Sequence, residues 1–115
     1  MKMEISHSNS VVVLKIIGEL MTRDDQQAAT DLVAARLSRG DRKFIFDFSE
    51  MPFISSLGIA TLVASHVKIN REGGETKLVN PRPKVLDILK MVKLDRIFSS
   101  YHTIKEATEA PWQNS

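Results

Sequence analysis

The chain has 115 residues, of which 43% are hydrophobic and 26% charged, so its composition is that of an ordinary soluble domain. Its 16 basic and 14 acidic residues give a net charge of +2 and are scattered along the sequence, which argues against direct binding of nucleic acid. Cysteine is absent, which excludes disulfides, and neither a signal peptide nor an apolar run of transmembrane length is seen, so we expect one cytoplasmic domain over residues 1–115, without membrane insertion.

The first segments of the chain predict a β-hairpin. The apolar, β-branched run Val11–Ile17 is typical of a buried strand, and a shorter strand is expected at Met3–His7. Residues Ser8–Ser10 have the composition of a tight turn, so the two strands should pair antiparallel. This hairpin should form one edge of a sheet.

A helix is predicted to begin at Thr22. Thr22 and Asp25 have the spacing of a capping box, in which the hydroxyl accepts an amide hydrogen bond and the carboxylate faces the positive end of the helix. Gly40 supplies the stop. Helical spacing predicts an inner face made of Ala28, Leu32 and Ala35, flanked by Ala29 and Val33.

The middle of the chain predicts a central strand followed by a second helix. Phe44, Ile45 and Phe46 form the unbroken apolar run of a buried strand, with Asp47 near its carboxyl end. The second helix follows Pro52. We expect it to place Ile59, Leu62, Val63, His66 and Val67 inward and Thr61, Ser65 and Lys68 outward.

The last third of the chain predicts two more strands and two more helices. "TKLVN" has the pattern of a core strand, and a third helix is expected to bury Val85, Leu89 and Val92 together with Leu86 and Ile88. A brief strand around Ile97–Ser100, a short helix from Thr103 and a frayed tail at 111–115 should follow. This alternation predicts a single α/β domain, with a small mixed sheet of four to five strands and about four helices packed on it.

The sequence gives little support for a metal site. His7, His66 and His102 are far apart and lack the spacing of zinc ligands. A lone histidine on the inner face of a helix, as predicted for His66, is more often a core or boundary group than a ligand.

Catalytic motifs are equally scarce. The glycine-rich phosphate-binding motifs and the G-x-S-x-G elbow of serine hydrolases are missing. Asp24 and Asp25 fit helix capping better than acid–base chemistry. Asp47 and Glu50 are the other carboxylates considered, and Asp47 either faces a groove or simply ends its strand in a turn. We therefore expect no cofactor and no catalytic residue.

The segment "FISSLG", Phe53–Gly58, leads from a strand into the start of a helix. Ser55 or Ser56 should cap that helix, since a serine oxygen can accept a hydrogen bond from an orphan amide. The free amides and the helix dipole also favour negative charge, so the same position suits a phosphate. Local spacing does not choose between these roles.

Three stretches together resemble the STAS domain family, and in particular the stand-alone anti-sigma factor antagonists of bacteria. They are "VVVLKIIGEL", "KFIFDFSEMPFISSLGIATLV" and "TKLVNPRPKVLDILKMVKLDRIF", of which the second is similar to the family core D-x-S-x-V-x-x-I-D-S-S-G-L-G-x-L. In that register Ser56 occupies the serine that a partner kinase phosphorylates and Gly58 the motif glycine. Ser55, Leu57, Ala60 and Met21 stand where the family more often has aspartate, a small residue, glycine and aspartate.

The resemblance implies a phosphorylation switch. The unphosphorylated chain would bind an anti-sigma factor that is itself a serine kinase, free a sigma factor for transcription, and be released on phosphorylation of Ser56, with a serine phosphatase as a further partner. ATP, magnesium and the catalytic base would belong to the kinase. The implied partner surface comprises Met21, Thr22, Asp24, Ser55, Ser56, Leu57, Gly58, Thr61, Ser65 and Lys68. The alternatives are a STAS adaptor subunit of a membrane lipid-transport complex without a phosphate switch and, third, an independent enzyme.

Overall fold

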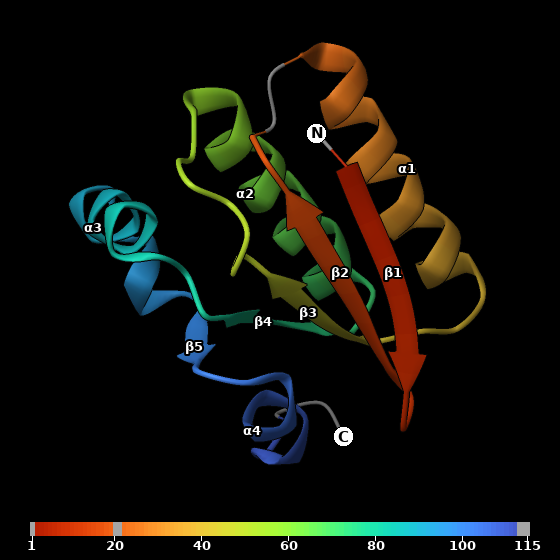
Figure 1. The fold of residues 1–115 in the computed structure, drawn as a ribbon. Helices are drawn as coiled ribbons and strands as arrows, with labels where there is room; N and C mark the ends of the chain where they lie inside the picture. The colour runs from red at the N-terminus through yellow and green to blue at the C-terminus, as the bar shows by residue number, and fades with distance from the viewer. Residues whose placement is uncertain (1, 20–21, 113–115) are drawn as a thin grey trace.

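The computed structural model describes residues 2–19 and 22–112. It contains one five-stranded sheet with helices on both of its faces (Figure 1). In chain order the elements are β1 (Lys2–Ser8), β2 (Val11–Ile17), α1 (Arg23–Ser38), β3 (Lys43–Asp47), α2 (Ser56–Arg71), β4 (Glu75–Val79), α3 (Pro83–Met91), the 3₁₀ helix η1 (Leu94–Arg96), β5 (Ser99–Tyr101) and α4 (Ile104–Glu109). The predicted mixed α/β fold is confirmed.

The strands follow one another across the sheet in chain order. β1 pairs antiparallel with β2, whereas β2, β3, β4 and β5 are parallel. Asn9 and Ser10 join the hairpin with φ angles of 51° and 67°, the left-handed conformation that a two-residue turn of the favoured hand requires. The parallel strands need crossover helices, so the carboxyl ends of β2, β3 and β4 meet at one edge of the sheet.

Side-chain alternation on the strands divides the interior into two cores. Phe44 and Phe46 of β3 point to the larger core, which also contains residues of α1, α2 and α3. Ile45, between them, belongs to the smaller core. This core also contains Ala107 of α4, the helix on the other face of the sheet (Figure 1). The smaller core consists of Val11, Val13, Ile45, Val79 and Ala107, with Tyr101 and Trp112 packed against it.

The predicted inner face of α1 is partly wrong: Leu32 packs against the larger core and the flanking Ala29 and Val33 are buried as expected, but the other two positions are not. Ala28 and Ala35 are exposed, and the buried residues are Ala29, Val33 and Leu37. The stripe that contains Val33 and Leu37 removes more apolar area from water than the alanine stripe does, so packing favours this rotation of the helix. The predicted capping box is confirmed: Asp25 N donates to Thr22 Oγ1 (3.0 Å) and Thr22 N donates to Asp25 Oδ2 (3.1 Å).

The predicted inner face of α2 is also partly wrong. Thr61 and Ser65, expected outside, are 3% and 2% exposed, whereas Val67, expected inside, is 39% exposed. α2 packs along α1, and small side chains on the facing surface let the two backbones approach closely. The buried hydroxyl of Thr61 donates to Leu57 O at 2.8 Å, which removes most of the cost of burying it.

Three predictions near the carboxyl terminus need correction. Val92 lies just beyond α3 and is 47% exposed, because the chain turns away there through Lys93, which has a φ of 64°. The last strand begins two residues later than predicted, since η1 precedes it and Ile97 is 53% exposed. Trp112, predicted to lie in a frayed tail, is partly buried, and its ring Nε1 donates to Thr108 O at 3.0 Å. Residues 113–115 lie outside the described residues.

Candidate functional site

The site predicted around Ser56 lies where the crossover from β3 enters α2. Register pairs Lys15 of β2, Asp47 of β3 and Val79 of β4 side by side, so the loops after these strands leave the sheet at the same edge. Asp47 is buried, and its Oδ1 accepts a hydrogen bond from Ser49 N at 2.9 Å. The strand therefore ends in a side-chain-stabilised turn, the simpler of the two roles considered for Asp47.

The loop of residues 48–55 is fixed by contacts with both neighbouring loops. Gly18 N, after β2, donates to Glu50 O at 3.0 Å. Arg82 Nε, after β4, donates to Ser49 O at 2.9 Å. The Glu50 carboxylate also pairs with the Lys15 ammonium group, and the hydrogen bond from Lys15 is the main reason why the pKa of Glu50 is lowered. Loops from three crossovers thus hold one another in place.

Apolar side chains anchor the second half of this loop. Met51 and Ile54 are 1% and 3% exposed and belong to the larger core. Phe53, between them, is 43% exposed. Gly58, in the first turn of α2, is buried, and a Cβ atom there would lie 2.9 Å from Ile54 Cγ1. The motif glycine is therefore required for close packing of the loop against the helix.

The two serines of "FISSLG" have different roles. Ser55 is the N-cap of α2, and its Oγ accepts a hydrogen bond from Gly58 N at 3.1 Å. Ser56 is the first residue of the helix, and it is exposed. The cap prediction is thus confirmed for Ser55, and Ser56 lies on the surface at the amino-terminal, positive end of the helix dipole.

The other predicted partner residues differ in their exposure. Thr22, Asp24 and Lys68 are exposed, Leu57 is half-buried, and Met21 lies outside the described residues. Thr61 and Ser65 are buried, so their side chains cannot belong to a surface that binds a partner. The exposed face of α2 instead carries Ala60, Ala64, Val67, Lys68 and Arg71.

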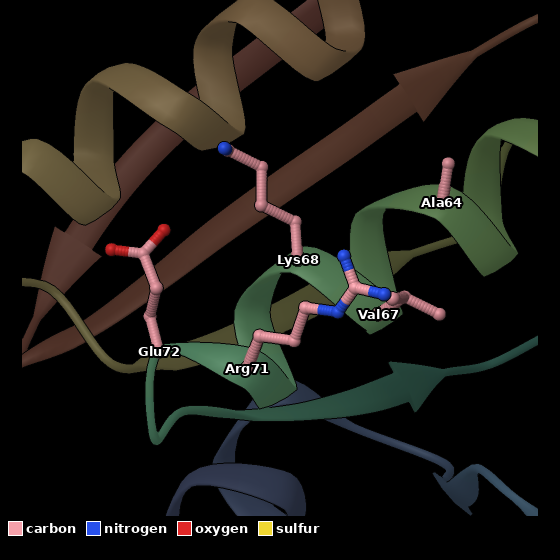
Figure 2. Close-up of a pocket in the computed structure, with 5 residues that line it drawn as sticks. All are labelled: Ala64, Val67, Lys68, Arg71 and Glu72. Carbon is pink, nitrogen blue, oxygen red and sulfur yellow. The ribbon is translucent and has the colours of Figure 1, made fainter.

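Lys68 lies well away from Ser56. It lines an open hollow of about 550 Å³ at the carboxyl-terminal end of α2 with Ala64, Val67, Arg71 and Glu72 (Figure 2). Figure 2 shows the Lys68 side chain directed toward α1 and the Arg71 guanidinium turned back beside Val67. Lys68 lies twelve positions after Ser56 in the same helix, which corresponds to about 18 Å along the helix axis. Lys68 therefore lies at the far end of α2 and does not belong to the site around Ser56.

His66 lies at the boundary of the larger core. Its ring meets Phe98 edge-on at 4.8 Å between centroids, and its Nδ1 is buried without a hydrogen-bond partner. Burial lowers the pKa of His66. Within the described residues no group of three or more histidine, cysteine, aspartate or glutamate side chains could hold a metal ion.

Two important residues were missed by the sequence analysis. Arg82 was not singled out, although its Nε donates to Ser49 O in the loop before Ser56. Lys77 was treated as one position of a core strand, although it is fully buried beneath α4. A lysine inside an otherwise apolar strand is rarely buried without partners, so its presence in "TKLVN" was the available signal.

The chain is thus a small α/β domain in which the helix that follows the central strand begins with an exposed serine. The sequence matches the STAS domain family over residues 2–107, so the chain belongs to the STAS domain family. None of the helices in residues 2–19 and 22–112 combines the length and the apolar character needed to cross a membrane.

Two sequence relatives and two solved structures illustrate the family. A candidate anti-sigma factor antagonist of Thermotoga maritima is 36% identical over 73 residues, which cover 64% of this chain and 65% of the relative. A homologue from Thermotoga neapolitana is 33% identical over 73 residues, again with 65% of the relative covered. A crystal structure of a candidate anti-sigma factor antagonist from Thermotoga maritima has a TM-score of 0.80 at 28% identity, with 93% and 92% of the two chains covered. Unphosphorylated SpoIIAA, an anti-sigma factor antagonist, shares the fold with a TM-score of 0.80 at 21% identity and 94% coverage of each chain.

Proposed function

We propose that this chain is an anti-sigma factor antagonist that acts in the cytoplasm by partner switching. In this proposal the unphosphorylated chain binds an anti-sigma factor with serine kinase activity and so frees a sigma factor for transcription. Phosphorylation of Ser56 then releases the chain, and a serine phosphatase resets it. The names of the Thermotoga relatives support the general role.

The observation that carries the switch is the exposure of Ser56 beside a cap that Ser55 already provides. The Ser56 hydroxyl oxygen would attack the γ-phosphorus of ATP on the kinase, the bond to ADP would break, and the hydroxyl proton would pass to the base of the kinase. The chain is therefore the substrate in this reaction, and the kinase is the enzyme.

Ser55 stands where the family more often has aspartate, but this difference is compatible with the proposal. Serine and aspartate are about equally good N-caps, so the helix start keeps its geometry with either residue. Ser55 Oγ accepts from Gly58 N as a capping aspartate would. A phosphate on Ser56 would then add about −1.5 to −2 charges at a helix amino terminus that tolerates them.

The loss of affinity on phosphorylation arises at the partner surface. Phosphate carries a hydration shell that an apolar or acidic partner surface can neither accept nor replace. A loss of about 2.7 kcal/mol lowers affinity a hundredfold, which is enough for a switch. The fold of the chain does not need to change.

The proposal is tested with purified anti-sigma factor kinases of the source organism. We expect one of them to bind the chain, to transfer phosphate from ATP to Ser56 and to release the product, as followed by mass spectrometry and calorimetry. Ser56→Ala should bind without being modified, and Ser56→Asp should bind at least tenfold more weakly. Ser55→Ala is the matched control and should still accept phosphate. Phosphate on another residue, or equal binding of Ser56→Asp, would contradict the proposal.

A further inference from the structure

Phe53 is an exposed aromatic residue in a loop that buries three other large apolar side chains, those of Phe48, Met51 and Ile54. It is 43% exposed, while Met51 and Ile54 on either side are almost completely buried. A half-exposed phenylalanine leaves a large apolar area in contact with water. The switch proposed for Ser56 does not use this side chain.

The loop that carries Phe53 is held at both ends. Arg82 Nε binds Ser49 O and Gly18 N binds Glu50 O, and at the other end Ser55 caps α2. The buried neighbours of Phe53 fix the backbone between these points. An aromatic side chain on such a preorganised loop loses little conformational entropy when a partner covers it.

A positive charge lies beside the same loop. Arg82 is exposed, and its guanidinium group contacts the loop at Ser49. Its charge also contributes to lowering the pKa of Glu50, after the larger effect of the hydrogen bond from Lys15. The carboxylate of Glu50 is already paired with Lys15, and among the described residues no carboxylate forms an ion pair with Arg82, so its guanidinium group is available to a partner.

Ser56 is close enough to share one interface with Phe53. Only two residues lie between them, so their Cα atoms are within about 11 Å of each other even if the chain were fully extended. A partner that covers Phe53 would therefore meet any phosphate placed on Ser56.

We infer that Phe53 is the apolar anchor by which the unphosphorylated chain binds its anti-sigma factor, with Arg82 as the charged contact beside it. The partner then presents an apolar pocket bordered by a carboxylate. This inference rests on the proposed function and adds the chemistry of recognition to it. It also explains why phosphorylation releases the partner. The carboxylate of the partner that pairs with Arg82 would repel a phosphate on Ser56.

Binding of Phe53→Ala to the purified anti-sigma factor kinase tests the anchor. We expect at least tenfold weaker binding by calorimetry, mostly through faster dissociation, because a central aromatic contact is lost. Phe53→Leu keeps apolar volume and should lose less. The matched control is Met91→Ala, since Met91 is 80% exposed and lies at the end of α3. The control should bind as tightly as the wild type.

The contribution of Arg82 is tested separately, by the rate of association. Arg82→Gln should slow association and reduce its dependence on salt concentration, because steering by the charge is lost. If the wild-type chain binds and is released by phosphorylation of Ser56 while Phe53→Ala binds equally well, the inference is wrong and the proposed function stands. If the wild-type chain binds none of the anti-sigma factor kinases, the proposed function fails first.

Discussion

The ammonium nitrogen of Lys77 lies 3.7 Å from the centroid of the Trp112 ring, within the smaller core. The same nitrogen donates hydrogen bonds to Ala107 O at 2.8 Å and to Ala110 O at 2.9 Å. A cation at these carbonyls satisfies acceptors at the end of α4 and opposes the negative end of its dipole. Burial lowers the pKa of Lys77, so these contacts offset the cost of keeping its charge away from water.

We predict that Lys77→Met destabilises the chain by about 1 to 3 kcal/mol, because one buried and one partly buried carbonyl lose a charged donor. Urea unfolding measures the free energy. Trp112 is the single tryptophan of the sequence, so its fluorescence reports directly on the packing of the segment after α4. The exposed Lys84 provides a control, and Lys84→Met should change stability by no more than about 0.5 kcal/mol. Equal effects of the two substitutions would contradict this account of Lys77.

The two serines before and within α2 should differ in their effect on stability. Ser55→Ala removes the cap hydrogen bond to Gly58 N and should cost about 1 kcal/mol in the free energy of unfolding. Ser56→Ala changes an exposed position and should leave stability nearly unchanged. Thermal unfolding of both variants checks this order, and a larger loss from Ser56→Ala would show that the cap is assigned to the wrong serine.

His66 should make stability depend on pH. Burial lowers its pKa below the ordinary value of 6.5, so the unfolded chain binds the proton more readily than the folded chain. The free energy of unfolding should therefore fall as pH drops below about 6.5, and this part of the decrease should be absent in His66→Phe, which keeps a ring against Phe98. Urea unfolding between about pH 7.5 and about pH 5.5 measures both profiles. Parallel profiles would exclude this role of His66.

Adjacent glycines after α2 should respond differently to alanine. At Gly74 a Cβ atom would lie 2.6 Å from the backbone oxygen of Arg42, and we expect Gly74→Ala to cost about 2 to 3 kcal/mol or to shift the backbone. Gly73 has open space around it but a φ of +84°, so Gly73→Ala should cost only about 1 to 2 kcal/mol. Circular dichroism melts of the two variants give the comparison. The reverse order would mean that backbone conformation, and not crowding, dominates at this turn.

Local patterns allowed much of the fold to be predicted. The hairpin follows from a β-branched run and a polar turn, and the start of α1 follows from the reciprocal spacing of Thr22 and Asp25. These features depend on residues a few positions apart, so the sequence specifies them directly. The motif around Ser56 likewise located the start of α2 correctly.

Features that depend on packing between distant segments could not be predicted in the same way. Thr61 and Ser65 look like outward residues by polarity, but they are buried because α1 packs closely there and Thr61 finds a carbonyl on its own helix. The sequence did not show which serine caps α2, because this depends on the exact residue at which the helix begins. The contact between Lys77 and Trp112 joins β4 to the carboxyl-terminal segment, and no pattern of neighbouring residues predicts it.

The loops at the carboxyl edge of the sheet are joined by a series of backbone hydrogen bonds. Gly18 N binds Glu50 O, Phe48 N binds Val79 O and Asn80 N binds Tyr101 O, so each crossover is tied to the next. Opening any one of these amides to exchange with solvent requires neighbouring loops to separate as well. We therefore expect this edge to exchange with solvent as one cooperative unit, with the loop before Ser56 protected to a similar degree as the adjoining strands.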